Sequence, residues 1–260
     1  MKLLSYAGRL TLISSVAASM PVYNMATNKV PISTCRELDA IVRKFWWIGN
    51  AEKNRFMAYK AWDKICQPKF VGGLGLRRFE DMNRALISKL AWSLAQNQDP
   101  PWVKCLLSKY CSRASFWAVE PRNGDSFLWK SILSTRNIVL KGSVTLAAEG
   151  SSIDFWAQPW IPWLDPIGFG QLMGSLDRNT LSITTVADIS TNGRWNREVV
   201  TDVFGADIGR KIMEIPRIPL HHHDQVVWKG NENGIFSVKS AYRIDQEHRF
   251  GQRRSLWRWV

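Results

Sequence analysis

The stretch DMNRALISKLAWSLA, residues 81–95, carries the clearest secondary-structure signal in this chain of 260 residues. Apolar side chains recur every four residues from Met82 to Leu94, which is the spacing of one face of an α-helix. The prolines at positions 100 and 101 cannot continue a helix, so the segment ends before them. We therefore predict an amphipathic helix that buries this face in a core.

The residues on the N-terminal side of this stretch also favour helices. Apolar residues from Tyr6 to Met20 show helical spacing, and Pro21 follows them. Thr34 with Glu37 three residues later matches a capping box, a pattern that starts a helix. On the two sides of residues 81–95 together, we expect helices at about residues 6–20, 34–45, 102–110 and 126–133. The first 140 residues are therefore predicted to be mainly helical.

Short alternating runs replace the helical spacing after Lys141. Residues 143–146 and 152–156 flank a short turn, and this arrangement predicts a β-hairpin. Residues 225–228 and 235–238 flank another turn and predict a second hairpin.

The remaining segments complete an α+β fold. Residues 157–185 are rich in Pro and Gly and predict a connector packed by Trp160 and Trp163. We expect two regions, a mainly helical one over residues 1–140 and one of short β-hairpins and helices over residues 141–260. The helices of the second region are expected at about 197–204, 206–213 and from residue 239.

The charge of the chain favours a polyanionic partner. Lys and Arg number 35 against 22 Asp and Glu, which gives a formal net charge of +13. Residues 1–150 hold 22 basic and 10 acidic side chains, so this half carries +12 of that charge. Lys and Arg neutralise phosphates and release their counterions, so the basic half predicts nucleic-acid binding.

Several of these basic residues alternate with aromatic ones, as in Arg43-Lys44-Phe45-Trp46-Trp47. Aromatic rings stack on bases or pack a core, and for the Trp residues we favour the core. The residues that we predict to bind RNA or an RNA–DNA duplex are Arg43, Lys44, Lys53, Arg55, Lys60, Arg77 and Arg78.

The search for catalytic chemistry finds only weak candidates. Gly72-Gly73-Leu74-Gly75 lacks the spacing of a nucleotide-binding loop and predicts a tight turn. The run from His221 to Asp224 places adjacent side chains in different directions, so a turn is favoured over a metal site. Glu80-Asp81 is explained as negative charge at a helix N-terminus. We therefore expect no catalytic residue, no bound metal and no cofactor.

The cysteines and the apolar runs bear on location. Cys35, Cys66, Cys105 and Cys111 are irregularly spaced and contain no Cys-x-x-Cys pair, which favours reduced thiols. Arg9 interrupts the apolar run near the N-terminus, which argues against a secretory signal. No run approaches the roughly 18 apolar residues that span a bilayer. We expect an intracellular protein without a membrane partner, in the nucleus or cytoplasm, with the mitochondrion as an alternative.

Separate motifs along the chain resemble one family. They are Leu4-Ser5-x-Ala7-Gly8-Arg9, Phe45-Trp46-Trp47, Trp62-x-x-Ile65-Cys66-x-Pro68-Lys69-x-x-Gly72-Gly73-Leu74-Gly75-Leu76-Arg77, Ser152-Ile153-x-Phe155-Trp156 and Asn233-Gly234-x-Phe236-Ser237-Val238-Lys239-Ser240-Ala241-Tyr242. With these motifs, the chain is similar to the region downstream of the polymerase palm in plant LINE-type (non-LTR) retrotransposon reverse transcriptases. The first half is also similar to a plant mitochondrial open reading frame of unknown function.

The resemblance implies a thumb-like first region and a second region that leads toward a zinc-binding segment and stops before its Cys/His ligands. In the family, a palm with a Tyr-x-Asp-Asp turn lies upstream, and ribonuclease H lies downstream. We expect these domains to be the missing partners of the chain, and the chain itself to be a non-catalytic fragment rather than an enzyme. The alternatives are a truncated form of a full RNA-directed DNA polymerase and an inert pseudogene product.

Overall fold

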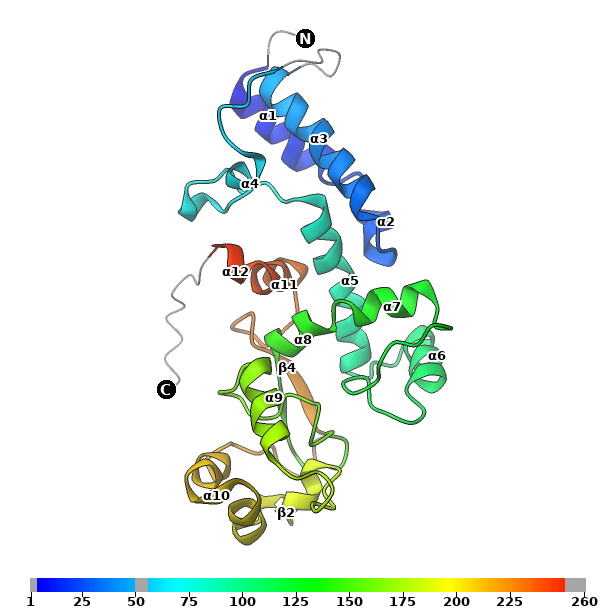
Figure 1. Cartoon of the computed structure of the whole chain (residues 1–260), viewed down its shortest axis with the longest axis vertical. Coiled ribbons are helices and arrows are strands. Elements are labelled where there is room, and N and C mark those ends of the chain that lie inside the picture. Colours follow the sequence, from blue (N-terminus) through cyan, green and yellow to red (C-terminus); the bar gives the residue numbers. More distant parts are fainter. Residues whose placement is uncertain (1–3, 50–55, 251–260) are drawn as a thin grey trace.

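The structure is a computed structural model that describes residues 4–49 and 56–250. It is elongated, with the N-terminal helices at one end and α10 (Arg197–Met213) at the other (Figure 1). Helices predominate and the strands are short and antiparallel, so the predicted α+β class is confirmed. No helix in the described ranges is long and apolar enough to cross a membrane.

The N-terminal end consists of helices and turns that pack against the start of α5 (Phe79–Ala95). Its core contains Ile13, Met25, Trp46 and Phe79, and we call it the N-terminal core. The elements before α5 are α1 (Tyr6–Leu12), the π-helical turn η1 (Ile13–Ala17), α2 (Val22–Thr27), α3 (Ile32–Ile48), α4 (Trp62–Ile65) and the 3-10 turn η2 (Lys69–Val71).

Helix α5 continues into a second core, the central core, which Ile87, Trp92 and Trp129 help to form. Of the predicted face of α5, Met82 and Leu94 are buried and the two leucines between them are partly buried. The buried side is wider than predicted, since Ile87 and Ala91 are also buried, and it serves both cores. Trp228 from the far end of the sequence lies in the central core, where its indole N–H donates to Ser240 Oγ at 2.8 Å. The helices of this part are α6 (Pro101–Tyr110), α7 (Phe127–Leu133), α8 (Arg136–Gly142), α11 (Val238–Asp245) and α12 (Glu247–Phe250).

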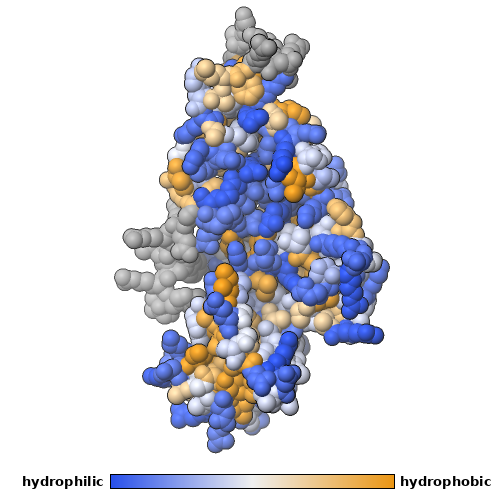
Figure 2. All heavy atoms as spheres, viewed as in Figure 1, coloured by the Kyte–Doolittle hydropathy of each residue, from blue (hydrophilic) through white to orange (hydrophobic). Residues whose placement is uncertain are grey.

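A third core, the distal core, contains Phe155, Trp160, Val200 and Ile212 and uses only residues between 147 and 215. Hydrophobic side chains also reach the surface at this end of the molecule, where α9 lies, whereas hydrophilic ones cover most of the opposite end (Figure 2). The elements here are α9 (Pro166–Ser175), η3 (Val186–Ile189), β2 (Ser190–Thr191), β3 (Arg194–Trp195) and α10.

Neither predicted hairpin forms. Strand β1 (Ser143–Leu146) pairs antiparallel with β4 (Gln225–Trp228), so Ser143 lies opposite Trp228. Residues 152–156 contribute only an isolated bridge between Asp154 and Thr185, and residues 235–238 lead into α11. The physical reason is burial: pairing with β1 places Trp228, which is fully buried, in the central core.

Other helix predictions differ from the structure at their ends. Helix α3 begins after Pro31, so Thr34 and Glu37 lie inside it and do not form a capping box. The expected helix over 6–20 is divided between α1 and η1. The segment expected to be a connector contains helix α9. A helix forms there because Asp165 caps it and Pro166 is tolerated in its first turn. The helices expected at 102–110, 126–133 and 81–95 are confirmed as α6, α7 and α5.

The division at residue 140 stays a prediction. The central core combines side chains of residues 87–139 with Trp228 and Ala241, so both sides of that boundary contribute to it.

Candidate nucleic-acid interface

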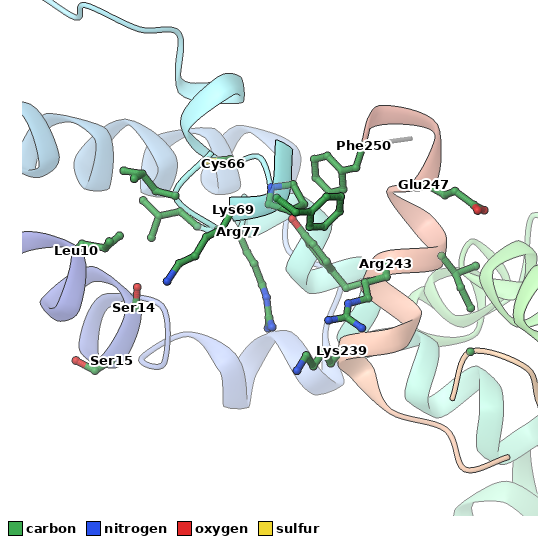
Figure 3. Close-up of a pocket in the computed structure, with 18 of the residues that line it drawn as sticks. Leu10, Ser14, Ser15, Cys66, Lys69, Arg77, Lys239, Arg243, Glu247 and Phe250 are labelled. Carbon is green, nitrogen blue, oxygen red and sulfur yellow. The ribbon is translucent and has the colours of Figure 1, made fainter. Parts of the chain in front are cut away.

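A groove of about 1150 Å³ lies between the N-terminal part and the C-terminal helices (Figure 3). One wall comes from the helical turn around Ser14 and from residues 66–77, and the other from residues 229–250. We call it the basic groove because six cationic side chains line it: Lys69, Arg77, Lys141, Lys229, Lys239 and Arg243.

Glu247 is the only carboxylate among the described residues that line the groove. Figure 3 shows Lys69, Arg77 and Arg243 directed into the space between the two walls, with Glu247 turned away from it. Like charges so close together repel one another unless counterions or a polyanion neutralise them.

The wall that carries Lys69 and Arg77 is shaped by the glycine-rich turn. Gly72 has a φ of 87°, and a Cβ on Gly73 would lie 1.9 Å from the carbonyl oxygen of Gln67. These positions need glycine, because other residues are strained at positive φ or would collide with the backbone. The predicted tight turn is therefore present, and it forms one side of the groove.

Helix α11 forms the opposite wall. The hydroxyl of Ser237 caps it by accepting the N–H of Ser240, and Lys239 and Arg243 are four residues apart, hence on one face. Tyr242 is buried beneath them, and the guanidinium of Arg77 lies 5.4 Å from the centre of its ring. This cation–π contact joins the two walls.

Lys229 differs from the other cations of the groove because it is half-buried, whereas the other five are exposed. It directly follows β4, and its backbone N–H donates to the carbonyl of Gly142 at 2.7 Å. Burial lowers the pKa of its ammonium group, against the opposing effect of Asp165.

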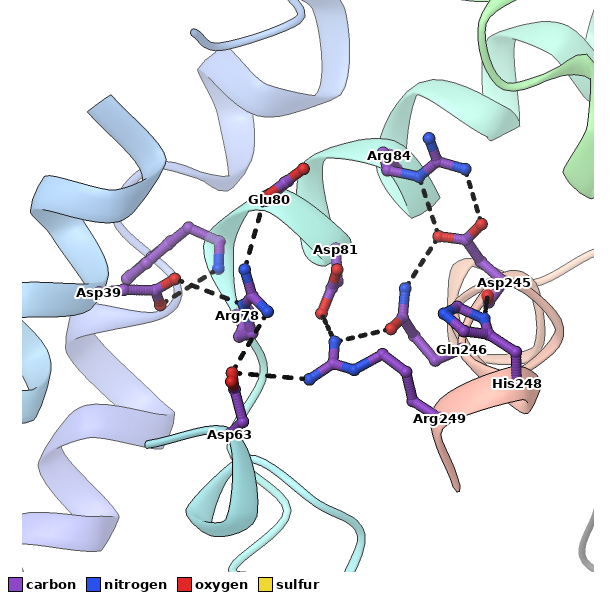
Figure 4. A network of polar contacts seen from close by, with 11 residues as sticks. Asp39, Asp63, Arg78, Glu80, Asp81, Arg84, Asp245, Gln246, His248 and Arg249 are labelled. Atoms are coloured by element: carbon purple, nitrogen blue, oxygen red, sulfur yellow. Dashed lines mark hydrogen bonds and ion pairs between the residues drawn. The ribbon is translucent and has the colours of Figure 1, made fainter. Parts of the chain in front are cut away.

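A network of ion pairs connects elements next to the groove, between the start of α5 and the C-terminal helices (Figure 4). Arg78 contacts Asp63 at 3.2 Å, Glu80 at 3.5 Å and Asp39 at 3.9 Å. Arg78 is thus occupied by three carboxylates, and it supports the groove from behind rather than lining it.

Arg249 on α12 extends this network to the C-terminal wall, with Asp81 at 2.6 Å and Asp63 at 3.8 Å. Burial raises the pKa of Asp81, and Arg249 and Arg78 oppose the rise. Glu80 and Asp81 therefore do more than place charge at a helix terminus, since each pairs with an arginine.

Arg84 and Asp245 form the second connection between α5 and α11. Two hydrogen bonds of 3.0 and 2.7 Å join the guanidinium to the carboxylate. The amide of Gln246 adds a third bond to the same carboxylate, at 3.0 Å. Two parallel bonds fix the relative orientation of the groups as well as their distance.

The residues predicted to bind nucleic acid are not all brought together. Arg77 lines the groove, and Arg78 lies in the ion-pair network. Arg43 on α3 and Lys60 before α4 are exposed and lie outside the groove lining, as does Lys44. Lys53 and Arg55 lie outside the described residues.

Sequence reasoning missed five cations of the groove. Lys229, Lys239 and Arg243 belong to residues 151–260, where 13 basic and 12 acidic residues nearly cancel, and Lys141 is one of the 22 basic residues before them. The charge count therefore directed attention to the first half. A signal was present in the spacing of Lys239 and Arg243, which places two cations on one helical face. Lys69 lies in the family motif between Trp62 and Arg77 but is not among the residues predicted to bind.

The other candidates for chemistry have structural explanations. His221, His222 and His223 are exposed, whereas Asp224 accepts hydrogen bonds from the backbone N–H groups of Ala148 and Gly150 at 2.8 and 2.9 Å. The four cysteines are unpaired. Within residues 4–49 and 56–250, no three or more His, Cys, Asp or Glu side chains are placed to hold a metal ion.

Two known proteins are similar to this chain, both from Arabidopsis thaliana. One, named "putative ribonuclease H protein", is 36% identical over 255 residues, which are 94% of this chain and 39% of that protein. The other, named "uncharacterized mitochondrial protein", is 27% identical over 144 residues, which are 55% of this chain and 93% of that protein. The chain thus spans about two fifths of the length of the first relative. No family model and no solved structure matches it.

The first similarity corrects one expectation. The chain was predicted not to be an enzyme, yet 94% of it is similar to a protein named as a ribonuclease H. That prediction is therefore wrong. The second relative is a plant mitochondrial protein, as the resemblance of the first half implies, and the two names together suggest a retrotransposon-derived protein.

Proposed function

We propose that this chain is the nucleic-acid-binding part of a retrotransposon-derived plant protein. Its motifs and the names of its two relatives support this origin. Within the longer protein it would correspond to the thumb and connection region, with the palm and ribonuclease H domains as its partners. Its ligand is RNA or an RNA–DNA duplex, held through phosphates without regard to base sequence.

The observation that carries this proposal is the uncompensated charge of the basic groove. Within the described part of the chain, none of its six cations forms an ion pair, whereas Arg78, Arg84 and Arg249 all do. The described lining of the groove thus gathers six cations with one carboxylate, Glu247, and this excess of positive charge is suited to an external anion. In complexes with nucleic acids, clustered lysines and arginines bind the backbone phosphates.

Salt dependence tests the proposal. The probe is a fluorescent RNA–DNA hybrid with a single-stranded extension, titrated by anisotropy at several salt concentrations. Each phosphate contact lowers the slope of log affinity against log salt by roughly 0.7 to 0.9. The double substitution Lys239→Gln with Arg243→Gln is expected to flatten the slope by about 1.5.

The matched control is Arg210→Gln with Lys211→Gln, which removes the same charge from α10, outside the groove. We expect this control to keep the original slope. An equal effect of both double variants would show that net charge alone drives binding. A salt-independent affinity would exclude phosphate binding.

The name of the first relative supports a second candidate, a nuclease activity of the longer protein. Incubating the chain with a hybrid labelled on its RNA strand, in the presence of Mg²⁺ or Mn²⁺, tests whether this part has the activity. Shortened RNA products would establish it for this chain. Intact RNA would assign the activity to other parts of the longer protein.

A further inference from the structure

We infer that the basic groove takes a single nucleic-acid strand a few nucleotides long, with phosphates on its cations and bases against its apolar residues. This inference rests on the proposed function, which names RNA or an RNA–DNA duplex as the ligand, and it assigns the groove itself to an unpaired strand.

The size of the groove supports a single strand. Its volume of about 1150 Å³ is slightly above the roughly 300–1,000 Å³ of pockets that enclose one drug-sized molecule. A few nucleotides fit such a space.

The positions of the cations lead to the same conclusion. Lys69 and Arg77 come from one wall, Lys239 and Arg243 from the other, and their charged ends share the space between (Figure 3). A ligand that touches both walls must lie inside the groove. Lys229 also lines the groove and is half-buried, whereas the other five cations are exposed.

The apolar residues of the lining favour unpaired bases, because the bases of a duplex are stacked inside it and cannot contact these side chains. Phe70 is 60% exposed at the groove, and Leu10 and the half-buried Phe250 also line it. Unpaired bases expose flat apolar faces that stack on such side chains, whatever the base. Cations interleaved with an exposed ring are the combination that binds single strands.

The first test compares two probes with equal numbers of phosphates, a homopolymeric single-stranded RNA and a blunt RNA–DNA hybrid. We expect the single strand to bind more tightly at the same salt concentration. Phe70→Ala should weaken binding of the single strand about tenfold and leave binding of the hybrid unchanged. Phe127→Ala is the control, because Phe127 is 63% exposed on α7, outside the groove.

The second test locates the strand. A single strand that contains a photoreactive halogenated uracil is irradiated in complex with the full chain, and the crosslinked peptide is identified by mass spectrometry. We expect a peptide that contains Phe70 or Phe250, and none that contains Phe127.

The outcomes separate the inference from the proposed function. Tighter binding of the hybrid, or equal effects of Phe70→Ala and Phe127→Ala, would overturn the single-strand inference and leave nucleic-acid binding in place. If neither probe binds, both fail. Circular dichroism of each variant checks that the fold is retained.

Discussion

Single polar side chains join distant parts of this chain. Asn83 on α5 donates to the carbonyls of Met25 and Asn28, both at 2.8 Å, and accepts the N–H of Val30 at 2.9 Å. It is almost fully buried, and these three bonds satisfy it. One side chain therefore holds the end of α2 against α5, and no residue type other than Asn supplies both donors and an acceptor in so short a side chain.

The Arg84–Asp245 pair carries a prediction about stability. Arg84→Ala removes both hydrogen bonds from a carboxylate that is 8% exposed, so its charge is left with the Gln246 amide alone. We expect the free energy of unfolding to fall by about 2 kcal/mol, in the range for buried bonds to charged groups. Chemical denaturation measures the change.

The control for that measurement is Arg210→Ala. Arg210 pairs with Asp207 at 2.8 Å, but both side chains are largely exposed. An exposed pair contributes about 0.5 kcal/mol or less. A loss at Arg84 no larger than the loss at Arg210 would contradict a bracing role for the Arg84–Asp245 pair.

Asp224 carries a prediction about pH. Burial by itself would raise the pKa of this carboxyl, but hydrogen bonds from Ser152, Ala148 and Gly150 outweigh it and lower the pKa. A carboxyl with a lowered pKa in the folded state stabilises the protein above its unfolded pKa, near 4, and loses this effect as the pH falls further.

We therefore expect Asp224→Asn to lower the free energy of unfolding by about 1 kcal/mol at neutral pH. The difference from the unsubstituted protein should shrink below about pH 4. Denaturation series at several pH values measure it, with Asp202→Asn at an exposed position of α10 as the control. A constant difference across the series would disprove the role of the ionised carboxylate.

At the scale of elements, glycine decides where α10 breaks. The helices predicted at 197–204 and 206–213 are the two parts of α10, and Gly205 between them has a φ of 74° and a ψ of 173°. Almost only glycine adopts this conformation, because a Cβ strains the backbone there.

Two glycine substitutions with open space around the added Cβ test this interpretation. Gly205→Ala is expected to cost about 2 kcal/mol of unfolding free energy through backbone strain. Gly170→Ala, inside α9, is expected to stabilise by up to about 1 kcal/mol, because alanine favours a helix over glycine. Thermal unfolding of both variants should show shifts of opposite sign, and shifts of the same sign would refute the explanation.

The pairing of β1 with β4 shows where local patterns stop being informative. Alternation predicted extended segments at 143–146 and 225–228, and both are strands. Their partners were wrong because alternation does not say which strands meet. The pairing depends on Trp228 in the central core and on Asp224, which binds the turn that follows β1.

At the scale of the whole molecule, the groove and the distal core are separate. All residues that line the groove lie before residue 78, at 141 or after residue 228, whereas the distal core lies within 147–215. The groove therefore depends on the N-terminal and central cores, with α5 between them.

Ile212→Ala tests this separation. Ile212 is fully buried in the distal core, so the substitution should cost roughly 2–4 kcal/mol there. We expect hydrogen exchange to accelerate within 147–215, while the affinity for the hybrid probe stays unchanged. Ile87→Ala in the central core is the contrast. It should lower both the protection from hydrogen exchange and the affinity for the hybrid probe. Loss of affinity in Ile212→Ala would show that the distal core supports the groove.

The sequence by itself determined the α+β class, the helices α5, α6 and α7, the glycine-rich turn and the basic character of the chain. These depend on side-chain spacing and on residue types that act within a few positions of one another. Only the tertiary structure decided the partner of β1, the use of Arg78 as an internal ion-pair donor, and the convergence of Lys69 and Arg77 with Lys239 and Arg243. The strand pair and the groove join residues far apart in the sequence, the groove across more than 150 positions, and Arg78 finds its carboxylates on three different elements. Burial and charge neutralisation in the folded chain select such contacts, and local spacing does not show them.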